Sequence, residues 1–277
     1  MKIGLVVDSV ANLPADLVER YEISVVPMYL KFGDHVYRDG VDLPPAGFYE
    51  MLSAKQVDVS TSGASVGDFR DAFDKALRRF ESLVCVTVAG VVSVTYNSAS
   101  LAAADLDGRV RVVDSRSASM AEGFVALEAA RASEAGASLD EVEVRAHEVA
   151  DRAALVATID TFEFLRRSGR VNALRAFAAT TLNVKPVFAL RRGSVEQLAR
   201  PLARSRAIER VVDETRNAAA DRALHLTVVH AARPDEARLL AERFEREMSP
   251  AEMYVTEFTP VMGAHTGPGL LGAAFWA

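Results

Sequence analysis

The sequence has few of the residues and segments that mark secreted, membrane-spanning or disulfide-bonded proteins. A single cysteine, Cys85, excludes an internal disulfide, and its apolar surroundings, SLVCVTVAG, favour a buried structural thiol. Uncharged apolar runs stay shorter than the roughly 18 residues that a membrane-spanning helix needs. The first apolar run reaches Asp8 too early for a signal peptide, so a cytoplasmic location is expected.

Positive charge and clustered metal ligands are also scarce. With 32 Lys and Arg against 38 Asp and Glu, the chain has a formal net charge of −6, which disfavours binding to nucleic acid. The five histidines are scattered, and neither an H-E-x-x-H motif nor a cysteine pair occurs. We therefore expect no structural or catalytic metal.

Two matches to known site motifs are better explained in other ways. GASVG, residues 63–67, fits the G-x-S-x-G nucleophile elbow, but QVDVSTS before it is too polar for a central strand, and Ser65 suits a helix cap. GPGLLG, residues 267–272, fits the G-x-G-x-x-G dinucleotide loop, yet only five residues follow it. Neither match is expected to form the site that its motif describes.

An α/β fold with two domains is the architecture that the pattern predicts. Over residues 1–160, short apolar runs alternate with helical periodicity, which is typical of a sheet with crossover helices. The expected strands lie in IGLVVD, ISVVPMYL, SLVCVTVA and RVRVVD. Helix starts are indicated by Pro14 and by two capping-box patterns, Ser65 with Asp68 and Ser138 with Glu141.

A second domain, α+β in character, is expected over residues 161–277. TFEFLRRSG and NALRAFAATTL have helical patterns, and KPVFALRRGSVEQLARPL is typical of two strands around an Arg-Gly turn. A series of helix, strand, helix and strand follows, which can form a sheet covered by helices on one face. The apolar end of the chain, after the expected loop HTGPG, should be buried.

Hydroxyl and acidic residues cluster where expected strands lead into helices. They are Asp8, Ser9, Ser93, Thr95, Asp114 and Ser115, together with Thr61 and Ser62 in a further loop before a helix. Ligands of open α/β sheets bind beyond the carboxyl ends of strands, where unpaired helix N–H groups attract anions. The cluster favours a site for a small anionic group, although each residue alone suits a cap or turn.

Two further side chains suit an anionic ligand. Arg170 follows a helix in RRSGRV, and His265 lies in the HTGPG segment, so either can complement a carboxylate or phosphate. The alternatives are that Arg170 satisfies carbonyls at a helix end and that His265 is structural. Spacing alone does not decide between these interpretations.

Eight short motifs occur in an order that resembles the DegV family over the whole chain. They are VVDSVANLP, VVPMYLKFGDHVYRDG, TSGAS, SVTYNSA, VVDSRSAS, LRRSGRV, LNVKPVFALRRGSV and HTGPG. The resemblance implies a two-domain fold with a lipid tunnel between an N-terminal α/β domain and a C-terminal α+β domain. One long-chain fatty acid is then the expected ligand, without any cofactor.

The resemblance also implies a partner and a set of ligand-binding residues. Similar proteins are fatty-acid-binding subunits that present the carboxylate to an ATP-dependent fatty acid kinase subunit, which forms an acyl phosphate for phospholipid synthesis. By motif, Thr61, Ser93 and His265 resemble carboxylate ligands, and Ser62 and Thr95 accompany them. Arg170 resembles a residue that serves phosphotransfer or the kinase interface. No catalytic residue is expected, and the chain is expected to be no enzyme by itself.

Four positions depart from the family pattern close to this expected site. Gly63 and Ala64 replace Gln and Pro, Val94 replaces the glycine of Ser-Gly-Thr, and Ser168 replaces the first glycine of Gly-Gly-Arg. Val94 adds bulk and does not easily adopt a positive φ, so the ligand's head group is expected to sit differently.

Two other functions stay open at this point. One is a lipid-binding or sensing protein without a kinase partner. The other is a serine hydrolase that uses Ser93 or Ser65 with His265, which requires an activated serine and an acid that orients the histidine, with Asp8 and Asp114 available. Acyl chain length, kinase identity and oligomeric state do not follow from the sequence.

Overall fold

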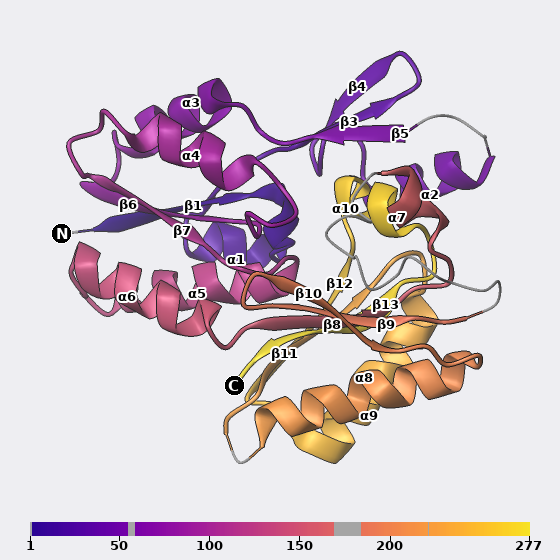
Figure 1. The fold of residues 1–277 in the computed structure, drawn as a ribbon. Helices are drawn as coiled ribbons and strands as arrows, with labels where there is room; N and C mark the ends of the chain where they lie inside the picture. Colours follow the sequence, from indigo (N-terminus) through magenta and orange to yellow (C-terminus); the bar gives the residue numbers. More distant parts are fainter. Residues whose placement is uncertain (1, 55–58, 169–183, 221) are drawn as a thin grey trace.

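The computed structural model describes residues 2–54, 59–168, 184–220 and 222–277, which form three sheets with helices packed around them (Figure 1). The α/β architecture expected from the sequence is confirmed. Sheet membership does not follow the expected division at residue 160 strictly, because the strand that ends at Thr158 lies in the sheet of the C-terminal strands. The domain boundary itself stays a prediction.

The first sheet is parallel and has the strand order β2-β1-β6-β7. Its strands are β1 (Ile3–Asp8), β2 (Ser24–Val26), β6 (Ser82–Thr87) and β7 (Val110–Asp114). Both faces are covered, so the middle of β6, residues 83–86, is apolar: Val84 packs into the core on one side and Cys85 into the core on the other. Cys85 is the buried free thiol that its sequence surroundings predict.

Six helical segments accompany the parallel sheet and its connections. They are η1 (Ser9–Ala11), α1 (Ala15–Arg20), α3 (Val66–Ala76), α4 (Thr95–Ala103), α5 (Met120–Glu134) and α6 (Leu139–Ala150). Phenylalanines of α3 pack with Cys85 on one face, and Phe124 of α5 belongs to the core on the other. Both predicted capping boxes form, at Ser65 with Asp68 and at Ser138 with Glu141.

A small antiparallel sheet corrects one strand prediction. Its strands β3 (Tyr29–Phe32), β4 (His35–Arg38) and β5 (Val59–Ser62) have the order β4-β3-β5, and α2 (Pro45–Ala54) lies between β4 and β5 in the chain. ISVVPMYL is therefore two strands, not one, with β2 and β3 in different sheets. Pro27 separates them, because proline has no N–H to donate to a ladder.

The third sheet has six strands in the order β10-β9-β8-β13-β11-β12. These strands are β8 (Ala154–Thr158), β9 (Val187–Arg191), β10 (Ser194–Ala199), β11 (His225–His230), β12 (Glu252–Glu257) and β13 (Leu271–Trp276). The β11–β12 pair is parallel and the other pairs are antiparallel. The predicted hairpin is confirmed, with its turn at Arg192 and Gly193, which both have positive φ.

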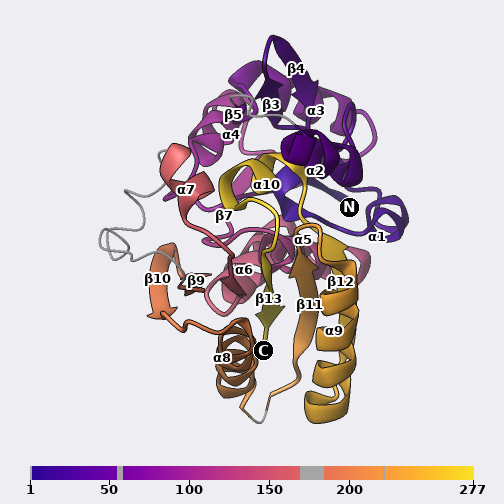
Figure 2. The ribbon, with the colours of Figure 1, turned by 90° about the vertical axis from the view of Figure 1, so that its right-hand side faces the viewer.

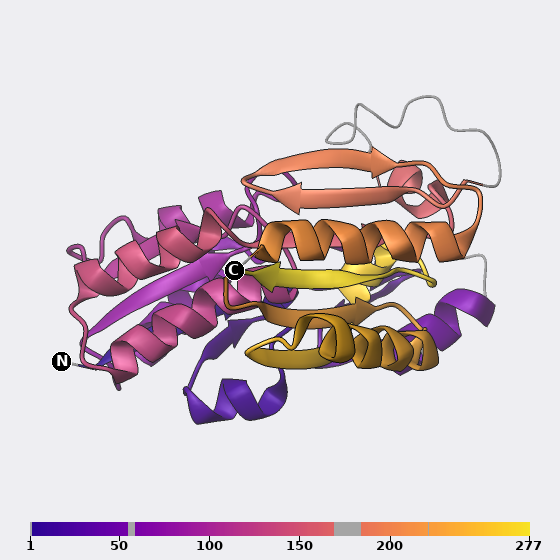
Figure 3. The same cartoon turned by 90° about the horizontal axis from the view of Figure 1, so that it is seen from below.

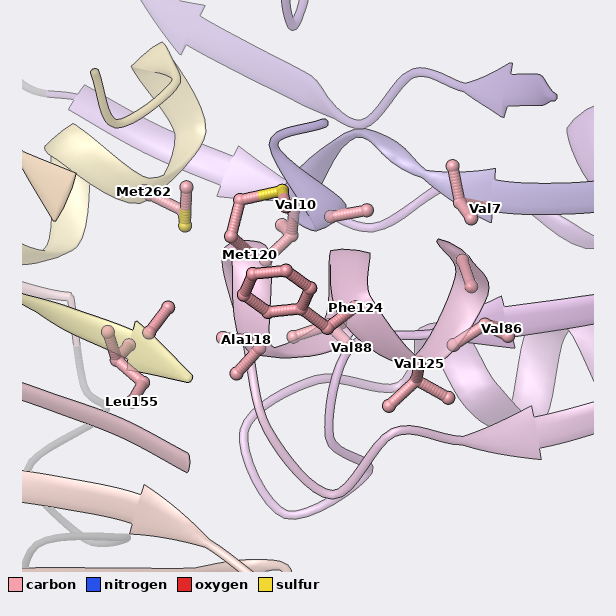
Figure 4. Close-up of a cluster of buried hydrophobic side chains, with 14 of the residues drawn as sticks. Val7, Val10, Val86, Val88, Ala118, Met120, Phe124, Val125, Leu155 and Met262 are labelled. Carbon is pink, nitrogen blue, oxygen red and sulfur yellow. The ribbon is translucent and has the colours of Figure 1, made fainter. Parts of the chain in front are cut away.

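Helices α8 (Arg204–Ala219) and α9 (Pro234–Met248) cover the outer face of the six-stranded sheet (Figure 3). Helix α5 lies against its inner face, so this one helix packs between the two large sheets (Figure 1). The close-up shows Met120 and Phe124 of α5 among Val10, Val88 and Leu155 (Figure 4). Val10 and Val88 follow strands of the parallel sheet, and Leu155 lies in β8 of the six-stranded sheet. The two large sheets therefore share one core.

The helix predicted in TFEFLRRSG is confirmed, and a second short helix forms near the end of the chain, where a loop was expected. Two short helices, α7 (Glu163–Arg167) and α10 (Pro260–Thr266), lie side by side at one end of the six-stranded sheet (Figure 2). The segment HTGPG is not wholly a loop, because His265 and Thr266 end α10. The apolar terminus is buried as predicted, as β13 within the sheet. The predicted helix NALRAFAATTL lies outside the described residues.

Candidate functional site

A cavity lies where the parallel sheet, the small sheet and the six-stranded sheet meet. It encloses about 950 Å³ of space, with open solvent at its mouth included. Most lining side chains are apolar, and the polar ones gather at one end. The lining includes Val10, Met28, Thr61, Ser93, Leu190 and His265.

Thr61 and His265 meet at the polar end of the cavity. The Thr61 Oγ1 and His265 Nε2 atoms are 2.9 Å apart, within hydrogen-bonding distance. Thr61 lies in β5, and pairing of β5 with β3 fixes its side-chain direction, whereas His265 lies in the last turn of α10. The strand and the helix therefore bring together two residues that are 204 positions apart.

Ser93 and Thr95 form the second polar wall. Their hydroxyl oxygens are 2.7 Å apart, and the Thr95 amide donates to Ser93 Oγ at 3.3 Å. Gly63 lies directly against this pair, because a Cβ there would be 2.8 Å from Thr95 Oγ1. A side chain at position 63 would push the TSG segment away, so the glycine lets the two hydroxyl-bearing segments approach.

The other departures from the family pattern do not fill the cavity. Val94 has φ −82° and a side chain that is 67% exposed, so the backbone needs no positive φ and the added bulk faces solvent. Ala64 is buried, and the Ser168 hydroxyl donates to the Leu165 carbonyl at the end of α7. The expected disturbance at position 94 therefore has no geometric basis in the cavity wall.

Of the six residues expected to bind ligand, four line the cavity: Thr61, Ser62, Ser93 and His265. Thr95 is buried behind Ser93 and hydrogen-bonds to it. Ser62 is the exposed member, which places the polar end next to the surface. Arg170 lies outside the described residues.

The acidic residues that end β1 and β7 bind backbone amides instead of facing the cavity. Asp8 accepts hydrogen bonds from the amides of Val10 at 2.9 Å and Val88 at 2.8 Å, and burial raises its pKa to about 7. Val10 and Val88 line the cavity, so Asp8 supports two of its walls from behind. Asp114 likewise accepts from backbone amides, those of Arg116 and Gly90.

Sequence reasoning did not identify the apolar lining. Much of it comes from the six-stranded sheet and from α10 and the residues before it: Leu155, Phe188, Leu190, Val195, Phe258, Val261 and Met262. The alternation of side chains along β9 indicates that one face of the strand points inward. Whether that face lines a cavity depends on how the sheets pack.

One group of possible metal ligands was also missed, because its members are far apart in sequence. The ligand atoms of Glu128, His225 and Glu252 all lie within 4.8 Å of one another. Arg131 bonds to both carboxylates, and Arg145 bonds to Glu128. These arginines already supply the charge that a cation would bring, so the arrangement is an ion-pair network joining α5, α6, β11 and β12.

Comparison with known proteins assigns the chain to a family. A family model described as "Uncharacterised protein, DegV family" matches residues 2–277. The chain belongs to the DegV family. A DegV domain-containing protein of Streptomyces coelicolor is 35% identical over 272 residues, which are 98% of this chain and 96% of the relative.

Two solved DegV structures are similar to this chain in fold and in sequence. One, described as fatty acid binding of a DegV family protein from Thermus thermophilus, is 31% identical, has a TM-score of 0.94 and covers 100% of both chains. The other, described as a fatty acid binding protein from Bacillus subtilis, is 25% identical, has a TM-score of 0.92 and covers 100% of this chain and 99% of its own. Within the described residues of this DegV protein, no helix is long and apolar enough to cross a membrane.

Proposed function

We propose that this DegV protein binds one long-chain fatty acid, with the acyl chain in the apolar part of the cavity and the carboxylate among Thr61, Ser93 and His265. The observation that carries the proposal is the polarity of the cavity, which is apolar except for hydroxyls and an imidazole gathered at one end. The described binding of fatty acid by the Thermus thermophilus and Bacillus subtilis relatives supports it.

The energetics suit a fatty acid. Burial of an alkyl chain contributes roughly 0.8 kcal/mol per CH₂, so a long chain yields on the order of 10 kcal/mol before ordering costs are subtracted. The carboxylate loses water on binding, and charge-assisted hydrogen bonds of about 1.5–3 kcal/mol each offset that loss. The acyl chain supplies the affinity, and the hydroxyls set the orientation.

We further propose that the bound acid is presented to a separate ATP-dependent fatty acid kinase subunit. The polar end of the cavity includes exposed Ser62, whereas Leu155 and Leu190 at the apolar end are buried, so a carboxylate at the polar end is accessible to a partner. Arg170 is proposed to serve phosphotransfer or the interface with that subunit.

The first test compares adjacent residues of β5. Thr61 lines the cavity, whereas Ser60 points to the opposite side of the strand and is exposed. Thr61→Val and Ser93→Ala should each weaken palmitate or oleate binding roughly tenfold, and Ser60→Ala should leave it unchanged. Native mass spectrometry of purified protein and titration with each acid measure this. An unliganded wild type that also takes up neither acid would refute fatty acid binding.

A second test separates presentation from storage and from catalysis. With an ATP-dependent kinase subunit present, the proposal expects acyl phosphate from the bound acid; a lipid-binding protein without a kinase partner yields none. The hydrolase alternative lacks support in the geometry, because Ser93 hydrogen-bonds to Thr95 while His265 Nε2 faces Thr61. Turnover of an acyl ester by the wild type, lost in Ser93→Ala, would overturn the carrier proposal.

A further inference from the structure

Behind the cavity wall lie two polar residues of the sequence motifs, Ser9 and Asp39. Neither of them lines the cavity. Asp39 follows β4 and is 2% exposed. Its Oδ2 atom accepts a hydrogen bond from Ser9 Oγ at 2.7 Å, and its Oδ1 atom accepts one from the Val261 amide at 3.0 Å. One buried carboxylate therefore connects the first residue of η1 with the start of α10.

Ser9 extends this connection to a third segment. Its hydroxyl oxygen accepts a hydrogen bond from the Met28 amide at 3.1 Å, between β2 and β3. Met28 and Val261 both line the cavity, on segments that are far apart in the sequence. The Ser9–Asp39 pair thus sets the spacing between two cavity walls through backbone amides.

Helix α10 depends on this remote carboxylate for its start. The residue before the helix, Thr259, makes no side-chain cap, and the Val261 amide in the first turn is one of the donors that a helix leaves unsatisfied. Asp39 satisfies it from 222 positions away. At its other end the same helix places His265 beside Thr61.

The helix has little freedom to settle elsewhere. Gly263 in its middle lies against α2, where an added Cβ would be 2.6 Å from Tyr49 Oη. Contact with α2 fixes how close α10 comes, and the bond to Asp39 fixes where it begins. The position of His265 follows from these two constraints.

We propose that Asp39, held by Ser9, is a positioning residue that sets the place of His265 in the carboxylate site by anchoring the start of α10. The proposal rests on the proposed function, in which His265 receives the carboxylate of a fatty acid. Asp39 itself does not touch the ligand. A role confined to stability would leave the geometry of Thr61 and His265 unchanged, so the two roles give different results.

The test uses Asp39→Asn, which keeps the shape of the side chain, with Ser9→Ala as a second variant if the first fails to fold. Ser138→Ala is the matched control, because it removes a helix cap far from the cavity. In the unliganded protein, the imidazole NMR signals of His265 should shift in Asp39→Asn and stay in place in Ser138→Ala. This readout needs no ligand, so it tests the positioning even if fatty acid binding fails.

The second readout is a double-mutant cycle on palmitate affinity. Asp39→Asn should weaken binding about tenfold in the wild-type background and have little further effect in a His265→Ala background, because it acts through that histidine. Equal losses in both backgrounds, or unmoved His265 signals in both Asp39→Asn and Ser9→Ala, would overturn the proposal. Absence of palmitate binding by the wild type, with shifted His265 signals in the variants, would refute the proposed function and leave the positioning intact.

Discussion

Three buried carboxyl groups, those of Asp8, Asp39 and Glu122, differ in their hydrogen bonding. Asp8 and Asp39 are buried carboxyl groups that accept hydrogen bonds from backbone or hydroxyl donors, which offset part of the cost of burial. Glu122 in α5 is fully buried, and neither of its carboxylate oxygens has a hydrogen-bond partner in the described part of the chain. Burial raises its pKa well above the ordinary value, and Asp8 and Asp114 raise it further.

This environment predicts a pH-dependent effect of Glu122→Gln. Because the pKa of Glu122 is raised in the folded state, the contribution of its protonated form to wild-type stability is fully present below the ordinary carboxyl pKa of about 4.5. That contribution is lost as the pH rises through the folded-state pKa. Glutamine does not titrate, so the free energy of unfolding of the variant relative to the wild type should increase as the pH rises above about 4.5. Urea denaturation at several pH values measures the difference, and parallel curves for the two proteins would contradict the expectation.

At the scale of elements, the segment between β7 and α5 joins the two large sheets beside the cavity. The Ser117 hydroxyl donates to the Leu190 carbonyl of β9 at 3.0 Å, and the Ser117 carbonyl accepts from the Ala89 amide at 2.8 Å. The Arg116 carbonyl accepts from Gly193 in the β9–β10 turn at 2.9 Å. Because Leu190 lines the cavity, these hydrogen bonds fix the position of the β9–β10 hairpin in the cavity wall.

Ser117→Ala should therefore lower both stability and fatty acid affinity. Loss of the hydroxyl is expected to cost about 1 kcal/mol of unfolding free energy, as for a typical buried hydrogen bond. Ser133→Ala is the control, since Ser133 donates in the same way to the Ile3 carbonyl, at 2.8 Å, away from the cavity. Denaturation and palmitate titration of both variants should show similar stability losses and a loss of affinity only in Ser117→Ala. Equal affinities in the two variants would count against a role of this segment in the cavity wall.

At the scale of the whole molecule, α5 carries the connection between the halves of the chain. Arg131 of α5 bonds to Glu252 of β12 at 2.6 Å and to Glu128 at 2.7 Å. Burial raises the pKa of Glu252, but hydrogen bonds from Arg131, His225 and Tyr254 outweigh it and hold that pKa well below its usual range. The network is therefore a charged contact that stabilises the packing of α5 on the six-stranded sheet.

Arg131→Met should destabilise the fold by about 2 kcal/mol at neutral pH, because it leaves two largely buried carboxylates without their shared cation. A depressed pKa gives stability that is present above the ordinary carboxyl pKa and is lost as pH falls, so the difference from wild type should shrink below about pH 4. Arg238→Met is the control, because the exposed Arg238–Glu242 pair is expected to contribute about 0.5 kcal/mol or less. Similar losses of unfolding free energy in both variants would contradict the expectation that the network contributes more than an exposed ion pair.

The sequence predicted those parts of the fold that depend on near neighbours in the chain. The capping boxes at Ser65 and Ser138 and the turn at Arg192 follow from backbone preferences that act within a few residues. The division of ISVVPMYL was missed because periodicity does not show that a chain changes sheets at Pro27. The helix that carries His265 was missed because GPG nearby suggests a loop, while a distant carboxylate supports the helix start.

What the sequence by itself determined is the alternation of strands and helices, the apolar terminus and the residue types available for a carboxylate site. What only the tertiary structure decided is which of them meet: Thr61 with His265, Gly63 with the Ser93 and Thr95 hydroxyls, and Asp39 with the start of α10. Local patterns reflect interactions over a few residues, whereas these contacts join segments up to 222 positions apart. Their distances are set by how the three sheets and α5 pack, which no spacing along the chain encodes.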